Sequence, residues 1–391
     1  MHIFFSVGEP SGDEHAAELI RELRRRRGDL RFSGFGGPRM EAAGCETLFT
    51  LTNLAVMGFL RVLPLLGQFF RLLKQAERHF AEDKPDAVIL VDFPGFNWWI
   101  ARKAKAAGIP VIYYLPPQLW AWAPWRIRRM KKYIDHVLCG LPFEPAWYAE
   151  RGMQVQYVGH PFFDKVMEHA LDDEFVARWR GNAPERPTLA LLPGSRNHEV
   201  HHNWPMILNV ARRLHERHPQ TRFLVANYKP AHREWCESQL TEADRRLPLE
   251  FFVGHTSDII EAADCALMVS GSVSLEMLAR ATPAVVLYRG TRLFYLAVRL
   301  LVTCKFMSLP NLMAGRAVMP EFLSITKIDR DEREMTAILA RWLSDANELA
   351  AARNELLRLR DEVLVTGATA KTATAVLDRL ERATQSRRAA A

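Results

Sequence analysis

Short apolar runs alternate with amphipathic stretches along most of the chain. Runs that are almost entirely apolar predict strands buried on both faces of a sheet. Five lie in the first part of the chain: His2–Val7, Arg31–Gly34, Ala87–Val91, Val111–Tyr114 and His136–Cys139. Five more follow: Thr188–Leu192, Arg222–Ala226, Leu249–Val253, Cys265–Val269 and Ala284–Leu287. Apolar residues at helical spacing after the first run predict a helix there, from Ala16 to Leu23.

This alternation of strands and helices predicts parallel sheets with helices on both faces. The two series are separated near Gly159–Asp164, so we expect two doubly wound, Rossmann-like domains at residues 1–165 and 166–344. The tail, residues 345–391, is rich in Ala, Leu, Arg and Glu and is expected to be helical. It would pack back on the first domain or on a partner subunit. Ligands bind at the carboxyl ends of such strands, so the expected site is a cleft between the domains.

Composition narrows the protein class. The chain has 391 residues, 49% hydrophobic and 25% charged, which is enough to build a packed core. Its 5 cysteines are scattered without a C-x-x-C pair, which is typical of a reducing compartment without a disulfide framework. The first residues lack the features of a signal peptide, and no long uncharged apolar run is present. We therefore expect a soluble or peripheral protein.

The net charge of +7 comes partly from two basic clusters. Arg24–Arg27 forms one, and Arg126–Lys132 forms the other, beside Trp120, Trp122 and Trp125. Basic residues with tryptophan suit an anionic membrane surface, although a solvated helix face is the alternative. No zinc-finger, RNA-recognition or helix-turn-helix signature is present, so no nucleic-acid partner is expected.

Two loops of the second domain follow predicted strands and contain small residues. Gly194, Ser195 and Arg196 can offer backbone amides, a hydroxyl and a guanidinium to a diphosphate, unless they form an ordinary turn. Ser270, Gly271 and Ser272 precede a helix and leave amides free for phosphate oxygens. Glu276 can accept hydrogen bonds from ribose hydroxyls, or can simply compensate the helix dipole.

Two loops of the first domain carry carboxylates. The glycines of Gly8–Asp13 (GEPSGD) can let the backbone approach a ligand closely, and Ser11 or Asp13 can cap the helix. The alternative is an ordinary strand–helix turn with a good cap. Asp92 follows a buried strand and is flanked by aromatic residues, so burial would raise its pKa. Such a carboxylate suits a general base that removes a hydroxyl proton, while capping of the next helix is the alternative.

Two further motifs are rejected. His198–His202 (HEVHH) fits a zinc-protease pattern, which needs an uninterrupted helix. Pro205 follows closely and predicts that the helix starts or is disturbed there, so no metal is expected. Gly34–Gly37 (GFGG) lacks the third glycine of the dinucleotide fingerprint, so no nicotinamide or flavin cofactor is expected.

Several segments together resemble the lipid-A-disaccharide synthase family, which has the two-domain GT-B architecture. In the first domain these are GEPSGD (8–13), GGPRM (36–40), VMG (56–58), KPD (84–86) with Asp92, AAGIP (106–110), WAW (120–122) and DHVLCGLPFE (135–144). GHP (159–161), LALLPGSR (189–196), SGSVSLE (270–276) and SLPNLMAGR (308–316) follow. Each motif is weak alone, but their order from about residue 3 to about residue 322 is highly specific.

The resemblance implies an inverting transfer of 2,3-diacylglucosamine from UDP to 2,3-diacylglucosamine 1-phosphate (lipid X), giving a β-1,6 disaccharide. It implies Asp92 and Glu9 as catalytic residues. It places UDP-sugar contacts at Gly194, Ser195, Arg196, Ser270, Gly271, Ser272, Glu276, Asn311 and Arg316. It places acceptor or lipid contacts at Ser11, Asp13, Val56, Met57, Phe59 and Leu60.

The resemblance also implies no metal and no cofactor. It implies a peripheral place on the cytoplasmic face of the inner membrane and a homodimer formed through the tail.

The chain departs from the family mainly in the first domain. Gly95 stands where a second Asp is common, and Arg61 stands where Glu is common. Leu115–Leu119, Ala123–Trp125 and Ser324 also differ. A GT-B transferase for another membrane lipid therefore remains an alternative. A catalytically inactive UDP-sugar-binding homologue is a second alternative, against which the presence of Asp92 argues.

Overall fold

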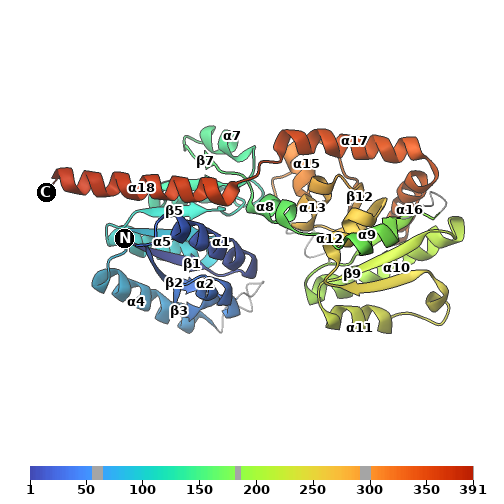
Figure 1. The fold of residues 1–391 in the computed structure, drawn as a ribbon, viewed down its shortest axis with the longest axis horizontal. Coiled ribbons are helices and arrows are strands. Elements are labelled where there is room, and N and C mark those ends of the chain that lie inside the picture. Colours follow the sequence, from blue (N-terminus) through green and yellow to red (C-terminus); the bar gives the residue numbers. More distant parts are fainter. Residues whose placement is uncertain (55–64, 181–185, 291–300, 391) are drawn as a thin grey trace. The chain divides into compact units, whose positions relative to one another are not determined.

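The computed structural model describes residues 1–54, 65–180, 186–290 and 301–390. The chain divides into two compact units, each built on one parallel sheet (Figure 1). The first unit comprises Met1–Asp164 and Val365–Ala391, and the second comprises Lys165–Leu364.

The first unit contains a seven-stranded sheet in the order β3-β2-β1-β4-β5-β6-β7. Its strands are β1 His2–Val7, β2 Arg31–Gly36, β3 Glu46–Thr50, β4 Ala87–Val91, β5 Val111–Tyr114, β6 His136–Cys139 and β7 Gln156–Tyr157. The central strands β1 and β4 are paired, with Val7 opposite Val91. Because the strands are parallel, the loops that follow β1 and β4 emerge side by side.

Alternate residues of these strands pack against two layers of helices. One face, with Phe5 and Ile89, packs against α1 (Pro10–Arg26) and α18 (Ala368–Ala390), which lie side by side (Figure 1). The other face, with Phe4 and Leu90, packs against α4 (Leu66–Glu82), α5 (Pro94–Ala106) and α6 (Ile127–Tyr133). Shorter elements are α2 Pro38–Ala42, η1 Leu51–Leu54, η3 Pro124–Arg126, α7 Glu144–Ala149 and α8 Pro161–Glu168.

The second unit contains a six-stranded sheet in the order β10-β9-β8-β11-β12-β13. Its strands are β8 Thr188–Leu192, β9 Arg222–Asn227, β10 Leu249–Val253, β11 Cys265–Val269, β12 Ala284–Arg289 and β13 Glu321–Ser324. Its helices are α9 Asp173–Arg180, α10 Asn197–Arg217, α11 Pro230–Ser238, η4 Asp244–Arg246, α12 Thr256–Ala262, α13 Val273–Arg280, α15 Leu309–Ala314, α16 Ile328–Ser344 and α17 Ala346–Val363. Helices α10 and α16 share the core of one face, and α13 packs beside α15 and α17.

All ten strands predicted from apolar runs are present, which confirms the two parallel sheets. Sequence patterning missed β3, β7 and β13. Each of these three strands lies at an edge of its sheet, where only one side is paired. Strand β3 is half-exposed throughout and β7 has 2 residues, so neither forms the buried apolar run by which the other strands were recognised.

The helical tail divides between the two units, contrary to its expected assignment as one segment. Helix α17 belongs to the second unit, where its Leu356 and Leu359 are buried. Helix α18 belongs to the first unit, where Val376 and Leu380 join the core of α1. The start of α18 is held by Asp164, whose carboxylate accepts hydrogen bonds from the backbone of Gly367 and Thr369 at 2.6 and 3.1 Å.

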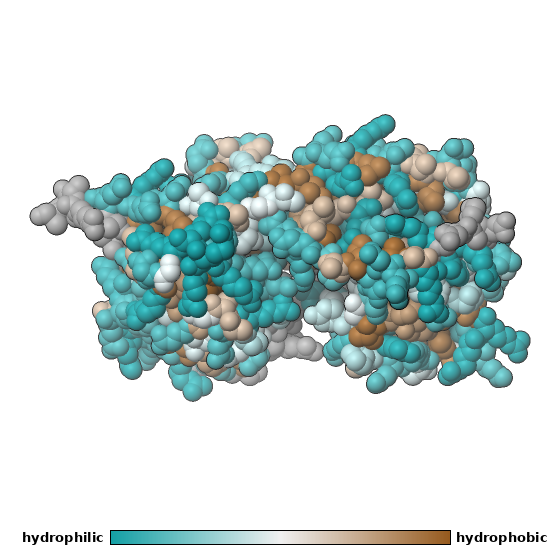
Figure 2. Space-filling view, viewed as in Figure 1, coloured by the Kyte–Doolittle hydropathy of each residue, from teal (hydrophilic) through white to brown (hydrophobic). Residues whose placement is uncertain are grey.

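The surface shown in Figure 2 is mainly hydrophilic, with hydrophobic residues in separate patches on both units. Among the helices that the structure describes, none combines the length and the hydropathy needed to cross a membrane.

Candidate functional site

The carboxyl edge of the first sheet brings two acidic residues together. Glu9 follows β1 and Asp92 follows β4, and these strands are paired up to Val7 and Val91. Gly8 permits the close approach of the two loops. A Cβ at this position would lie 2.2 Å from the ring of Phe93, so any larger residue would displace that ring.

The backbone at Asp92 is strained. Asp92 and Phe93 have φ values of 45° and 47°, in the left-handed region that residues other than glycine rarely adopt. Such a conformation costs on the order of 1–3 kcal/mol per residue and persists only where surrounding contacts enforce it. The turn therefore demands specific support from the rest of the unit.

Asn97 and Tyr113 supply that support. The fully buried amide of Asn97 donates from Nδ2 to the backbone carbonyls of Asp92, Val91 and Ser6, at 2.7–3.2 Å. Its Oδ1 accepts a hydrogen bond from the Ser6 hydroxyl at 2.6 Å. The Tyr113 hydroxyl donates to the same Asp92 carbonyl at 2.8 Å. These contacts hold the Asp92 main chain, so the direction of its side chain is determined by the core.

The Asp92 carboxyl group has an unusual protonation equilibrium. Burial, and then the negative charge of Glu9, raises the pKa of Asp92 to about 7. The group is therefore partly protonated near neutral pH and can exchange a proton at little cost. Helix α5 has Phe93 at its N-cap without a side-chain cap, so Asp92 does not cap it. The capping alternative for Asp92 is thus wrong.

Ser11 and Asp13 do not cap α1 as the sequence predicted. The helix begins at Pro10 with Glu9 as its N-cap and has no side-chain cap, so both residues lie within its first turn. Asp13 is buried, and its carboxylate accepts hydrogen bonds from the backbone amides of Gly37, Arg39 and Met40 at 2.9–3.1 Å. Asp13 thus fixes the GGPRM segment, whereas Ser11 is exposed at the edge.

In the second unit, the loop after β8 ends at the start of α10. Glu199 organises this loop, because its Oε2 accepts hydrogen bonds from the backbone amides of Ser195 and Arg196 at 3.1 Å. Its Oε1 pairs with the Arg196 guanidinium at 2.8 Å. Gly194 has a φ of 120°, and a Cβ there would lie 2.7 Å from Glu199. Ser195 and Arg196 are both exposed.

The second small-residue loop lies next to the first, because β8 pairs with β11 and Leu192 lies opposite Met268. Gly271 and Ser272 are exposed at the start of α13. The amides of Ser274 and Leu275 in this helix already donate to the Gly271 and Ser272 carbonyls, at 3.1 and 2.9 Å, so the amides that could face an anion are those of the loop before them.

The carboxylate of Glu276 is buried in the first turn of the same helix. Its Oε1 pairs with Arg280 at 3.0 Å. Arg280 also pairs with Glu261 at 3.2 Å, so the guanidinium is shared between two carboxylates. This pair fixes the orientation of the Glu276 carboxylate in the first turn of α13.

Two residues expected to contact UDP have other partners. Asn311 is fully buried, and its amide donates to Met319 O and Glu321 and accepts from the backbone of Val318 and Met319, at 2.7–2.8 Å. It therefore orders its own loop. Arg316 forms an ion pair with Glu355 of α17. Contact of either residue with UDP stays a prediction.

Val56, Met57, Phe59 and Leu60, the expected lipid contacts, lie outside the described residues. Just beyond them, Leu66 and Phe70 at the start of α4 are exposed. Trp99, Trp122 and Trp125 are also exposed, in segments that follow β4 and β5. Trp122 stacks under Arg126, with 4.3 Å between the guanidinium carbon and the ring centre. Large apolar side chains are thus exposed in segments that leave the sheet at the edge that carries Asp92.

The rejected zinc motif lies on an uninterrupted helix, because α10 continues through Pro205. The helix starts just before the motif, at Asn197, as Pro205 suggested, but it is not disturbed there, so helix continuity does not exclude the motif. Its Glu199 is nevertheless engaged by the preceding loop, and His202 Nδ1 donates to the His198 carbonyl at 2.8 Å.

One trio of metal-ligand type was found among the described residues: His2, His79 and Asp83. Arg31 pairs with Asp83 and lies 3.1 Å from His2 Nδ1. A guanidinium already satisfies this carboxylate, which disfavours a cation there.

Sequence reasoning missed Asn97 and Glu199. For Asn97 the available signal was a polar residue at the fourth position of a helix that is otherwise apolar toward the sheet. For Glu199 the signal was a carboxylate three residues after the helix N-cap, which is a known capping position. The zinc-like pattern diverted attention from it.

The sequence matches the model of a known protein family. The profile of the family described as lipid-A-disaccharide synthetase matches residues 3–364. Lipid-A-disaccharide synthase of Myxococcus xanthus (strain DK1622) is 38% identical over 97% of each chain. The enzyme of the same name from Nitrosococcus oceani is 39% identical over 81% of each chain.

Solved structures resemble the chain at the level of the fold. UDP-GlcNAc 2-epimerase from Neisseria meningitidis bound to UDP-GlcNAc has a TM-score of 0.63 at 11% identity, over 97% of this chain and 100% of that one. Calicheamicin glycosyltransferase has a TM-score of 0.59 at 17% identity, over 97% and 98%. Together with the two parallel sheets, these likenesses show a GT-B fold with two Rossmann-like domains.

Proposed function

Because the chain belongs to the lipid-A-disaccharide synthetase family, we propose that it is an inverting glycosyltransferase that forms the lipid A disaccharide. The donor is UDP-2,3-diacylglucosamine and the acceptor is 2,3-diacylglucosamine 1-phosphate. The new bond joins the donor anomeric carbon to the acceptor 6-hydroxyl, and UDP leaves.

Asp92 is the proposed general base. Its carboxylate removes the proton of the acceptor hydroxyl as the oxygen attacks the anomeric carbon from the face opposite UDP. A pKa of about 7 allows the group to be ionised before the reaction and to hold the proton afterwards. This partly buried carboxylate beside Glu9, on a turn held by Asn97, is the observation that carries the mechanistic proposal.

The loops of the second unit are the proposed diphosphate site. The exposed amides after β11 and the Arg196 guanidinium would stabilise the negative charge that develops on the leaving UDP. Glu276 would bind the ribose through its second oxygen, while Arg280 holds the first. The acceptor would bind on the first unit, beside Asp92.

We further propose a peripheral position at the cytoplasmic face of the inner membrane. The support is the set of exposed side chains Leu66, Phe70, Trp99, Trp122 and Trp125 beside the Asp92 edge. Arg128, Arg129 and Lys132 on α6 are exposed nearby and would meet anionic headgroups. Both lipid substrates would then reach the site without leaving the membrane.

The test is a reconstituted reaction with UDP-2,3-diacylglucosamine and 2,3-diacylglucosamine 1-phosphate in detergent micelles. We expect UDP release in equal amount to a disaccharide lipid, identified by mass spectrometry. UDP release only with another lipid acceptor would favour the alternative that the chain is a GT-B transferase for a different membrane lipid. Binding of UDP without any turnover would refute the proposed activity.

A further inference from the structure

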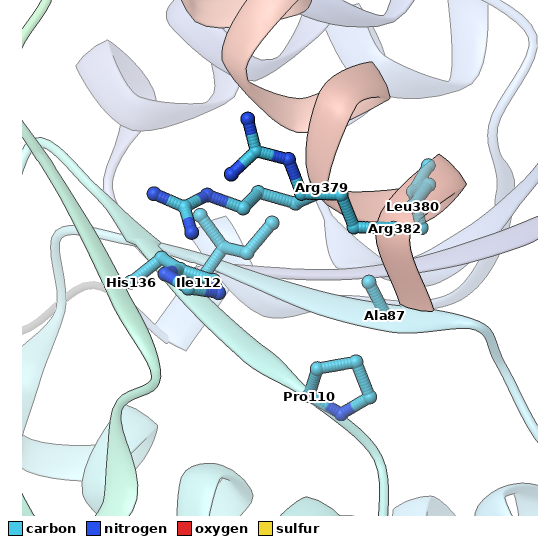
Figure 3. Close-up of a pocket in the computed structure, with 7 residues that line it drawn as sticks. All are labelled: Ala87, Pro110, Ile112, His136, Arg379, Leu380 and Arg382. Carbon is cyan, nitrogen blue, oxygen red and sulfur yellow. The ribbon is translucent and has the colours of Figure 1, made fainter. Parts of the chain in front are cut away.

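A small basic pocket lies at the amino edge of the first sheet, opposite the edge that carries Asp92. Its volume is about 200 Å³. It is lined by Ala87, Pro110, Ile112, His136, Arg379, Leu380 and Arg382 (Figure 3). Residues Ala87 and His136 begin β4 and β6, and the two arginines come from α18. The pocket therefore exists only because the last helix packs back on this sheet.

The charges around the pocket are unbalanced. Arg379 and Arg382 are three residues apart and so lie on one side of α18, and both guanidinium groups extend toward His136 (Figure 3). Burial lowers the pKa of His136, and the positive charges of both arginines lower it further. Within the described chain, neither arginine has an ion pair with a carboxylate.

Neighbouring acids are engaged elsewhere or are too distant. Asp135 is held by Lys105 at 2.6 Å and by the Val111 amide at 2.8 Å. Glu381 of α18 approaches Arg27 at 3.8 Å. Asp378 lies one turn before Arg382 but forms no ion pair with it in the described residues. The carboxylate of Asp135 offsets part of the positive charge at His136, but it is already bound by Lys105 and the Val111 amide. Among the described residues the two guanidinium groups therefore remain available to an anion.

We propose that this pocket binds a phosphate group attached to a small apolar substituent. Two adjacent guanidinium groups match phosphate oxygens in geometry and charge. Below them, Ala87, Pro110, Ile112 and Leu380 form an apolar floor that would contact the substituent. The volume is below the roughly 300–1,000 Å³ of pockets for drug-sized ligands. The pocket therefore fits a headgroup-sized ligand and not a UDP-sugar.

A phospholipid headgroup and a soluble phosphomonoester share this chemistry, and the probes must separate them. The full-length protein is first saturated with UDP. UDP then occupies the proposed diphosphate site of the second unit, so that the phosphate probes cannot bind there. It is then titrated with glycerol 3-phosphate, or with phosphatidylcholine vesicles with and without phosphatidic acid. The imidazole resonances of His136, assigned with His136→Gln, report local binding by NMR.

We expect one of the two phosphate probes to shift the His136 resonances, and the double variant Arg379→Gln/Arg382→Gln to weaken that binding at least about tenfold. Lys371→Gln, on the same helix but outside the pocket, is the matched control and should bind normally. An unchanged thermal midpoint of the double variant would show that it folds.

A response to glycerol 3-phosphate identifies a soluble ligand, and a response only to phosphatidic acid identifies a lipid headgroup. Overturning results are no response to either probe, or equal binding by the double variant.

Discussion

The carboxyl edges of the two sheets are built in opposite ways. In the first unit, the edge carries a partly buried carboxyl group on a strained turn, and three core side chains hold the turn in place. In the second unit, the edge carries exposed small residues and an exposed arginine, and the carboxylate of Glu199 organises the loop after β8. A proton acceptor needs a controlled environment, whereas a diphosphate site needs accessible donors. This difference predicts which substitutions affect chemistry and which affect binding.

The largest effect is expected from Asp92→Asn, which removes the proposed base. Turnover should fall about 10²–10⁴-fold while UDP affinity is unchanged. The same variant should be more stable than the parent above pH 7. Because the folded-state pKa of Asp92 is raised, ionisation opposes folding as pH rises from the ordinary aspartate pKa of 3.8 through about 7. Initial rates, UDP titration and thermal melts at pH 5 and pH 8 test this, and normal turnover would remove the assignment.

Asn97→Ala tests whether the strained turn requires its core support. Loss of the amide leaves the Ser6 hydroxyl and three buried carbonyls with fewer partners, so the free energy of unfolding should fall by about 2–3 kcal/mol. In the protein that remains folded, kcat should fall more than KM rises, and the pH profile should change. Denaturant melts and rate profiles distinguish this outcome from simple destabilisation. Simple destabilisation would leave the kcat and KM of the folded molecules unchanged.

In the second unit, Arg196→Ala should weaken UDP binding about 10–100-fold, since it removes a charged hydrogen-bond donor. Glu199→Gln should have a smaller effect in the same direction, because the amide oxygen can still accept from the two loop amides but cannot pair with Arg196. Calorimetric titration with UDP measures both. Arg213→Ala, at an exposed ion pair on the same helix α10, is the control and should bind UDP normally. The proposal for this loop fails if Arg196→Ala matches that control.

Glu9→Gln should move the pH dependence without abolishing the reaction. Glu9 raises the pKa of Asp92, so removal of its charge should lower that pKa. The acid limb of the rate profile should shift from near pH 7 to lower pH, and the rate at pH 6 should rise relative to the rate at pH 8. An unmoved limb would mean that the two carboxyl groups do not interact, whereas complete loss of activity would give Glu9 a direct catalytic role.

The smallest effect is expected from Gly95→Asp, which restores the residue common in the family. A Cβ at position 95 meets no atom within 4 Å, so the side chain fits. Replacement of a helical glycine and a negative charge near the start of α5 should together stabilise the unit by about 1 kcal/mol. The added charge should also raise the Asp92 pKa slightly. Thermal melts measure the change in stability, and the acid limb of the rate profile measures the change in the Asp92 pKa. A destabilised protein would contradict the open space found at position 95.

Much of this architecture was predictable from short-range patterning. Ten of the strands and the order of the loops were recovered because buried parallel strands are continuously apolar. The edge strands β3 and β13 were not, since one-sided pairing relaxes that requirement. The loops with Asp92 and Arg196 were found because both follow predicted strands. The partners of Asp13 and Arg316 could not be predicted because they are distant in sequence, whereas Asn311 bonds the segment that follows its own helix.

By itself, the sequence determined the strand and helix series, the position of each chemically active loop and the family to which the chain belongs. Only the tertiary structure decided which loops became neighbours, which carboxylates were already engaged, and how Asp92 acquires its raised pKa. The physical reason is that burial and charge proximity depend on strand order and long-range packing. Local residue patterns do not encode them directly.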